Sequence, residues 1–153
     1  VRSRRQRQMC IRDRGLNPRD IARNLTEQTG IEARRGHRIA RTEVPMALRR
    51  ARWDEQDQAQ EDYGTQAKLM HMSALSPTTR LTHARRHAKL FTSEETREWY
   101  ARDANAINCK CSQVSVLVDE KGEPLVPAIV DRARKNYQVM KDKGNGPWAD
   151  DKE

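Results

Sequence analysis

The sequence contains few of the residues that build a large hydrophobic core. Of its 153 residues, 35% are hydrophobic, 5% are aromatic and only one is phenylalanine, whereas 34% are charged. A chain of this composition can bury only a small core. We therefore expect one modest domain with long helices that rely partly on a partner for burial.

Long hydrophobic runs are also missing. No segment approaches the roughly 20 consecutive apolar residues that span a bilayer, and no apolar region follows the basic N-terminus as it does in a secretory signal. The sequence therefore predicts no membrane partner and gives no support to secretion.

Cysteine is too scarce for a disulfide framework, since the chain has three. Cys109 and Cys111 are separated by a single residue, so a bond between them would close a tight and strained ring. The third, Cys10, lies in the basic N-terminal segment. We expect reduced thiols and a cytoplasmic setting.

The positive charge is concentrated at the N-terminus. The net charge is +8, and residues 1–14 contribute +5 of it through six arginines and one aspartate, which leaves +3 for the rest. This segment resembles the translated sequencing-adapter remnants found at the ends of metagenomic reading frames, so we treat it as an artefact or a disordered leader. The global argument for nucleic-acid binding is then weak.

Helix signals dominate residues 15–64. Asn17-Pro18 is typical of a helix start, and Gly30 is typical of a helix end. A second, longer helix is predicted over residues 31–63, and we expect Pro45 to kink it rather than to divide it.

The remainder alternates between strands and short helices. We predict a small α+β core over residues 65–126, with strands at 67–75 and 111–118 and a helix that begins at Ser93 with a partial capping box. In the second strand, Val114, Val116 and Val118 are expected to share one face.

Residues 127–153 are predicted to form a C-terminal helix and a frayed tail. The helix begins at Pro127 and runs to about Lys143. Trp148 lies in the tail, where we expect it to be mobile or bound by a partner. The predicted fold class is α+β: long N-terminal helices packed on a small antiparallel sheet, with a closing C-terminal helix.

Four side chains in the second half could bind a metal. His83 and His87 are four residues apart and would share one face of a helix, whereas Cys109 and Cys111 would point to one side of an extended segment. Two imidazoles and two thiolates suit tetrahedral zinc. The alternative is a buried thiol pair with hydrogen-bonded histidines and no cofactor. A Cys–His nucleophile and zinc-assisted hydrolysis are two further interpretations of these residues.

The long helix carries a cluster of basic residues ahead of its acidic ones. This pattern indicates either a solvated face with internal ion pairs or a surface for an acidic partner, which would be DNA or an acidic protein. The candidate partner-binding residues are Arg34, Arg35, Arg38, Arg49, Arg50, Arg52 and Trp53.

Several short motifs occur in a characteristic order over residues 36–125. They are Arg-Thr-Glu at 41–43, a short strand at 68–72, Thr-Arg-x-x-His at 79–83 and Ile-Asn-Cys-x-Cys at 107–111. In this order and spacing they resemble the Mu F-like minor head protein family of tailed phages.

The resemblance implies a structural head-morphogenesis protein that contacts the portal and the capsid or scaffold proteins and acts in capsid assembly and in DNA packaging or ejection. Such a protein would reside in the capsid interior of the virion, and in the host cytoplasm during assembly. Members usually carry a longer N-terminal region, so we expect a C-terminal fragment. The family suggests no catalytic residue, and we expect no enzyme.

A structural role for the motif residues is the simplest physical account of them. We expect a clamp that holds the 79–90 segment against the strand, with Arg80 pairing with Glu43 or a neighbouring carboxylate. Its members are Arg41, Glu43, Arg80, His83, Asn108, Cys109 and Cys111. The alternative function is a zinc-stabilised DNA-binding or nuclease module that uses His83, His87, Cys109 and Cys111 and could contact DNA non-specifically.

Overall fold

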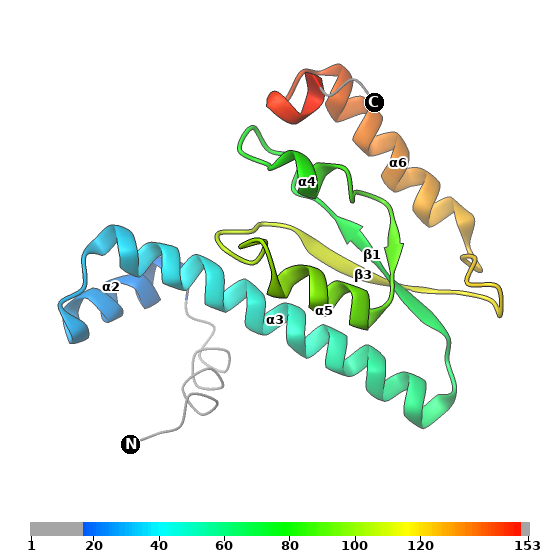
Figure 1. Ribbon diagram of the computed structural model, residues 1–153, viewed down its shortest axis with the longest axis horizontal. Helices are drawn as coiled ribbons and strands as arrows, with labels where there is room; N and C mark the ends of the chain where they lie inside the picture. The colour runs from blue at the N-terminus through cyan, green and yellow to red at the C-terminus, as the bar shows by residue number, and fades with distance from the viewer. Residues whose placement is uncertain (1–16, 151–153) are drawn as a thin grey trace. The chain divides into compact units, whose positions relative to one another are not determined.

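The computed structural model describes residues 17–150, so the N-terminal segment 1–14 lies outside the described residues (Figure 1). The fold is α+β, as predicted. The described chain divides into two compact units, one of residues 17–52 and 100–109 and one of residues 53–99 and 110–150. The segments predicted from the sequence, 15–64, 65–126 and 127–153, are continuous stretches of the chain. Each of the two units, in contrast, combines two stretches that are far apart in the sequence.

The first unit is built from α2 (Pro18–Thr29) and the N-terminal part of α3 (Ala33–Tyr63). As predicted, the Asn17 side chain caps α2 by accepting a hydrogen bond from the Arg19 N–H, and Gly30 ends it with a left-handed φ of 67°. A small core of Ile21, Ala22 and Ala40 joins the two helices.

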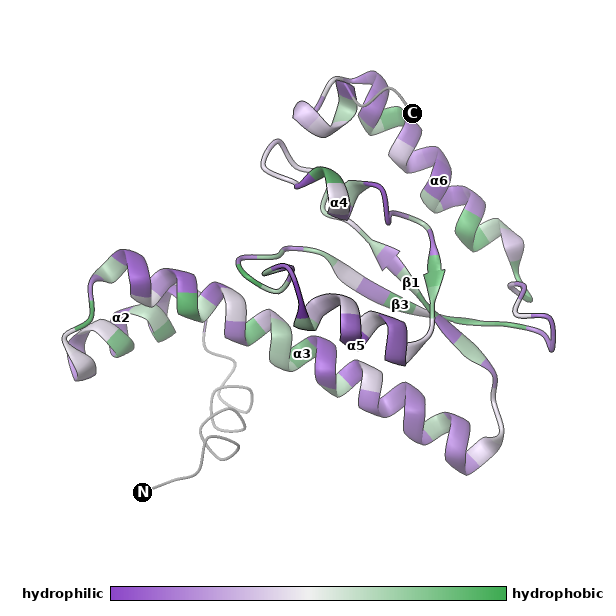
Figure 2. Cartoon of the chain, in the orientation of Figure 1, coloured by the Kyte–Doolittle hydropathy of each residue, from purple (hydrophilic) through white to green (hydrophobic). Residues whose placement is uncertain are grey.

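The helix α3 runs without interruption through Pro45 for 31 residues. Proline removes one backbone donor from the helix interior, yet the rest of the hydrogen-bonded helix continues to Tyr63, and Gly64 follows it with a φ of 65°. Figure 2 shows that most of this helix is hydrophilic. Within residues 17–150, neither α3 nor any other helix is long and apolar enough to cross a membrane.

The second unit contains a three-stranded antiparallel sheet in the order β2-β1-β3. The central strand β1 (Ala67–Met72) pairs with β2 (Leu90–Phe91) and with β3 (Ser112–Leu117). Its register with β3 places Met70 opposite Val114 and His71 opposite Gln113. Because neighbouring residues of a strand point to opposite faces, these two pairs lie on different faces of the sheet.

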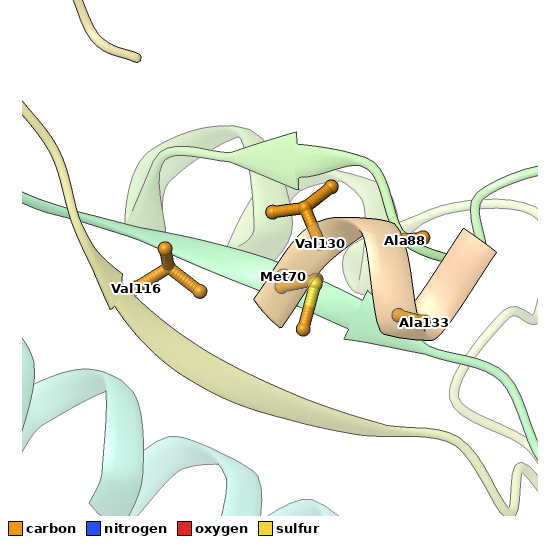
Figure 3. Close-up of a cluster of buried hydrophobic side chains, with 5 residues drawn as sticks. All are labelled: Met70, Ala88, Val116, Val130 and Ala133. Atoms are coloured by element: carbon orange, nitrogen blue, oxygen red, sulfur yellow. The ribbon is translucent and has the colours of Figure 1, made fainter. Parts of the chain in front are cut away.

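One face of the sheet is covered by α6 (Pro127–Asp142). Met70 and Val116 pack there against Val130 and Ala133 of the helix, and Ala88 completes the cluster (Figure 3). Val130 and Ala133 of α6 therefore form part of the core, whereas the neighbouring Ile129 is exposed.

The other face is covered by the C-terminal part of α3 and by α5 (Ser93–Ala101). Trp53 Nε1 donates a hydrogen bond to Gln113 Oε1, and Arg97 Nη2 of α5 contacts Asp54 and Asp57 at 2.8 and 2.7 Å. Gln113 is buried although Val114 is exposed. The predicted shared face of Val114, Val116 and Val118 is confirmed by the register, although Val114 is 39% exposed, and Gln113 is buried on the opposite face.

Two predicted boundaries were also wrong. The strand expected over residues 67–75 ends at Met72, because the Ser73 N–H donates to His87 Nδ1 instead of to a neighbouring strand. The capping box of α5 begins one residue earlier than predicted: Thr92 Oγ1 accepts from the Glu95 N–H, and Glu95 Oε2 accepts from the Thr92 N–H.

The C-terminal segment is folded onto the second unit, which corrects the prediction of a frayed tail. A 3-10 helix, η1 (Pro147–Asp150), places Trp148 in a cluster with Leu75 and Ala84. The indole is 1% exposed, and its Nε1 donates to the Ser76 carbonyl. Trp148 is thus a core residue.

Candidate functional site

Three metal-capable side chains meet inside the second unit. His71 comes from β1, His83 from the one-turn helix α4 (Leu81–Ala84), and Cys111 directly precedes β3. One ligand atom from each lies within 4.8 Å of the others, and Cys111 Sγ is 3.4 Å from His83 Nδ1. The three residues are only 1%, 2% and 6% exposed. They form the buried His/Cys cluster.

Aromatic and polar groups surround the buried His/Cys cluster. Trp99 of α5 meets the two imidazoles edge to face, with ring centroids 5.4 Å from His71 and 4.7 Å from His83. The Arg86 guanidinium lies over the Trp99 ring at 4.4 Å. On another side, Ser73 Oγ is 3.7 Å from Cys111 Sγ. The cluster is therefore held in position by packing as well as by hydrogen bonds.

His87, a predicted zinc ligand, has a different environment. Its Nδ1 accepts the Ser73 N–H and its Nε2 lies 3.2 Å from the Ala133 carbonyl, so Nε2 carries the proton. Burial lowers the pKa of His87 from its usual 6.5, an effect that the hydrogen bond to Ala133 partly offsets. His87 is a buried neutral histidine that links Ser73, the residue after β1, to α6. Both of its ring nitrogens are hydrogen-bonded to backbone groups.

Cys109, another predicted ligand, belongs to the first unit. Its Sγ lies 3.6 Å from the Tyr100 hydroxyl, and its carbonyl accepts a hydrogen bond of 2.8 Å from Arg49 Nη2. The Arg49 guanidinium also lies 4.9 Å over the Tyr100 ring. Cys109 is thus part of a buried contact between α3 and the 100–109 segment.

Most of the predicted arginine surface is exposed on α3. Arg49 and Trp53 are exceptions, since they are 5% and 1% exposed, and their predicted role as contacts for a partner is corrected by this burial. We use the term α3 arginine surface for the exposed residues Arg34, Arg35, Arg38, Arg41, Arg50 and Arg52.

A hollow of about 580 Å³ lies beside the N-terminal part of α3, within the first unit. Three arginines line it, so its charge favours an anion. Its lining residues are Arg34, His37, Arg38, Arg41, Ile107 and Asn108.

The remaining clamp residues are distributed between the two units. Arg41 and Glu43 are exposed on α3, and Arg80 is exposed before α4. The Asn108 N–H donates to Thr42 Oγ1, which fixes the 107–108 segment to α3 within the first unit. The pairing of Arg80 with Glu43 stays a prediction.

His71 is the member of the buried His/Cys cluster that the spacing of residues did not indicate. It is separated from His83 by 11 intervening residues and from Cys111 by 39, so no ligand-spacing motif includes it. His71 could be recognised only from its position in β1, because its pairing with Gln113 brings it beside the start of β3. The spacing of residues along the chain does not reveal this register, which is defined only by the pairing of β1 with β3.

Comparison with known proteins gives one family match. The sequence model of the family described as Phage Mu protein F like protein matches residues 11–114, about two thirds of the chain. None of the curated proteins and none of the solved structures matches the chain.

Proposed function

Because this chain belongs to the Phage Mu protein F like family, we propose that it is a non-enzymatic minor head protein that acts in capsid assembly and in DNA packaging or ejection. It would bind the portal and the capsid or scaffold proteins. Its site of action would be the host cytoplasm during assembly and the capsid interior in the finished virion.

The observation that carries this proposal is the family match, which covers four of the motifs described above, at residues 41–43, 68–72, 79–83 and 107–111. The match includes α2, α3 and the sheet strands β1 and β2. The family suggests head morphogenesis. A protein with that role acts by contacting other virion proteins, so we expect such contacts for this chain.

The α3 arginine surface supports binding to an acidic face of another head protein. Arg34, Arg38 and Arg41 recur at three- or four-residue intervals, so they lie along one side of the helix. A stripe of exposed arginines attracts an acidic protein surface and orients it during encounter. Arginine near a helix N-terminus is electrostatically unfavourable, because it opposes the helix dipole. Its presence there is therefore better explained by binding than by helix stability.

Co-expression with the portal, capsid and scaffold proteins encoded in the same genome tests the proposal. We expect the chain to co-purify with one of them in a complex of defined mass. Replacing Arg34, Arg38 and Arg41 by glutamate should weaken that complex roughly tenfold or more. Since all three positions are exposed and Arg34→Glu improves the charge match with the α3 dipole, unfolding of α3 would not explain such a loss.

The matched control reverses charge elsewhere. Arg132→Glu with Lys135→Glu changes two exposed residues of α6 and should leave the complex intact. The proposal is wrong if the chain binds none of these head proteins, or if both sets of reversals weaken binding equally.

A second candidate, DNA contact, is favoured by the basic hollow near Arg34 and Arg41. DNA affinity should be measured on residues 15–153, because the N-terminal segment would bind DNA non-specifically by its charge alone. Binding through this hollow should weaken as salt rises and should be lost on Arg38→Glu. Affinity that does not depend on salt would exclude DNA as a partner of this surface.

A further inference from the structure

We propose that His71, His83 and Cys111 bind a zinc ion that joins β1, α4 and the start of β3. These residues come from three segments that are separate in sequence, and each presents a nitrogen or sulfur ligand to one buried point. The proposal is independent of which head protein the chain contacts.

The separations within the cluster suit tetrahedral coordination. Zinc binds histidine nitrogen at about 2.0–2.1 Å and cysteine sulfur at about 2.3 Å, so adjacent ligand atoms in a tetrahedral site lie roughly 3.3–3.6 Å apart. Cys111 Sγ and His83 Nδ1 are already 3.4 Å apart, and every separation in the set is within 4.8 Å. Small side-chain adjustments would therefore complete the geometry.

The type of ligand and the burial together indicate zinc in a structural role. Zinc is a borderline-soft ion that binds thiolate and imidazole well, whereas calcium and magnesium prefer carboxylates and carbonyls. The three ligand residues are nearly inaccessible to solvent, so a substrate could not reach the ion. The fourth ligand would be a water or the nearby Ser73 hydroxyl, 3.7 Å from Cys111 Sγ.

Two features of the surroundings would orient the ligands. The edge-to-face contacts of Trp99 with both imidazoles restrict the rotation of their rings. The pairing of β1 with β3 fixes the backbone beside His71 and Cys111. Metal sites commonly depend on such outer contacts to hold the ligands in place.

The competing account is a cluster without a metal, held by packing and by hydrogen bonds such as that between Cys111 and His83. Metal analysis of the full chain, purified without chelator, distinguishes the two. We expect about one zinc ion per chain, and removal of zinc by EDTA should lower the melting temperature by roughly 10 °C, reversibly on adding Zn²⁺. Protein that contains no zinc and whose melting temperature is unaffected by Zn²⁺ and EDTA would overturn the proposal.

Substitution of single cysteines assigns the ligand. Cys111→Ser should lose the zinc, whereas Cys109→Ser, a matched change of a buried cysteine in the first unit, should retain it. Cys10→Ser should also retain it. Retention of zinc by Cys111→Ser would overturn the assignment.

A spectroscopic measurement avoids relying on a variant that fails to fold. Cobalt replaces zinc in tetrahedral sites and gives visible bands together with sulfur-to-cobalt charge transfer when a thiolate is bound. The unmodified chain and Cys109→Ser should both show the charge-transfer band, and Zn²⁺ should displace it. A cobalt spectrum without sulfur ligation would exclude Cys111 as a ligand.

Discussion

Trp148 Nε1 donates a hydrogen bond of 3.0 Å to the carbonyl of Ser76, which lies 72 positions earlier in the chain. The bond connects η1 to the loop after β1, and the indole fills a cluster with Leu75, Ala84 and Ala149. The last described turn of the chain is therefore part of the second unit's core.

Trp148→Ala should destabilise the protein by about 3–5 kcal/mol, because it removes a fully buried aromatic side chain and leaves a cavity. Measured by urea or thermal unfolding, this corresponds to a loss of roughly 10 °C or more in melting temperature. Trp148→Phe is the control. It keeps most of the apolar contact and loses the hydrogen bond, so it should cost about 1–2 kcal/mol. Equal stability of Trp148→Ala and the unmodified protein would contradict the burial of Trp148.

Local signals predicted the helices well because their physical causes lie within a few residues. The Asn17 cap and the positive φ of Gly30 depend on nothing distant, and both were predicted. The shift of the α5 cap from Ser93 to Thr92 was a local error. Thr92 and Glu95 have the spacing that a capping box requires, so this cap was predictable from the sequence.

The site and the C-terminal segment depend on contacts between distant residues, and there the sequence was a poor guide. His71 meets Cys111 only because β1 and β3 pair in one register. Trp148 looked like part of a polar tail because its neighbours in sequence are polar, whereas it packs against distant residues such as Leu75, Ala84 and Tyr137. Likewise, Trp53 lies among charged residues but packs toward Gln113. Neighbouring residues in the sequence carried no information about these partners.

The contact of Arg49 with the Cys109 carbonyl leads to a second prediction. Arg49→Met keeps the aliphatic length of the side chain but removes the donor, and it leaves a buried carbonyl without that hydrogen bond. We expect a loss of about 2–3 kcal/mol. Arg50→Met is the matched control at an exposed position next to it and should change stability by less than about 0.5 kcal/mol. Comparable effects of the two changes, measured by chemical denaturation, would argue against the buried contact.

The capping box of α5 provides a third prediction. Thr92→Ala and Glu95→Ala should each cost about 0.5–1.5 kcal/mol, since each leaves one backbone N–H of the first turn without its partner. The double variant should cost less than the sum, because the two side chains belong to one motif. Glu94→Ala is the control, as Glu94 is exposed and outside the box. Additive effects in the double-mutant cycle would contradict the reciprocal geometry.

The lowered pKa of His87 predicts how stability depends on pH. His87 is buried and neutral in the folded protein, whereas in the unfolded chain it takes up a proton near its usual pKa of 6.5. Above that pH it is neutral in both states and has no effect. As the pH falls below about 6.5, the unfolded state gains its proton first, so the free energy of unfolding decreases by up to about 1.4 kcal/mol per pH unit. The decrease ends once the pH is below the folded-state pKa.

His87→Asn isolates this contribution. The asparagine oxygen can take the place of Nδ1 as acceptor for the Ser73 N–H, but it does not titrate. Urea unfolding at pH 7.5 and 5.5, with EDTA present so that no bound metal contributes, should show the variant to be less stable at pH 7.5 but less sensitive to acid. The difference between the two proteins should therefore narrow toward pH 5.5. A constant difference would mean that His87 takes up its proton equally in the folded and unfolded states, which its burial opposes.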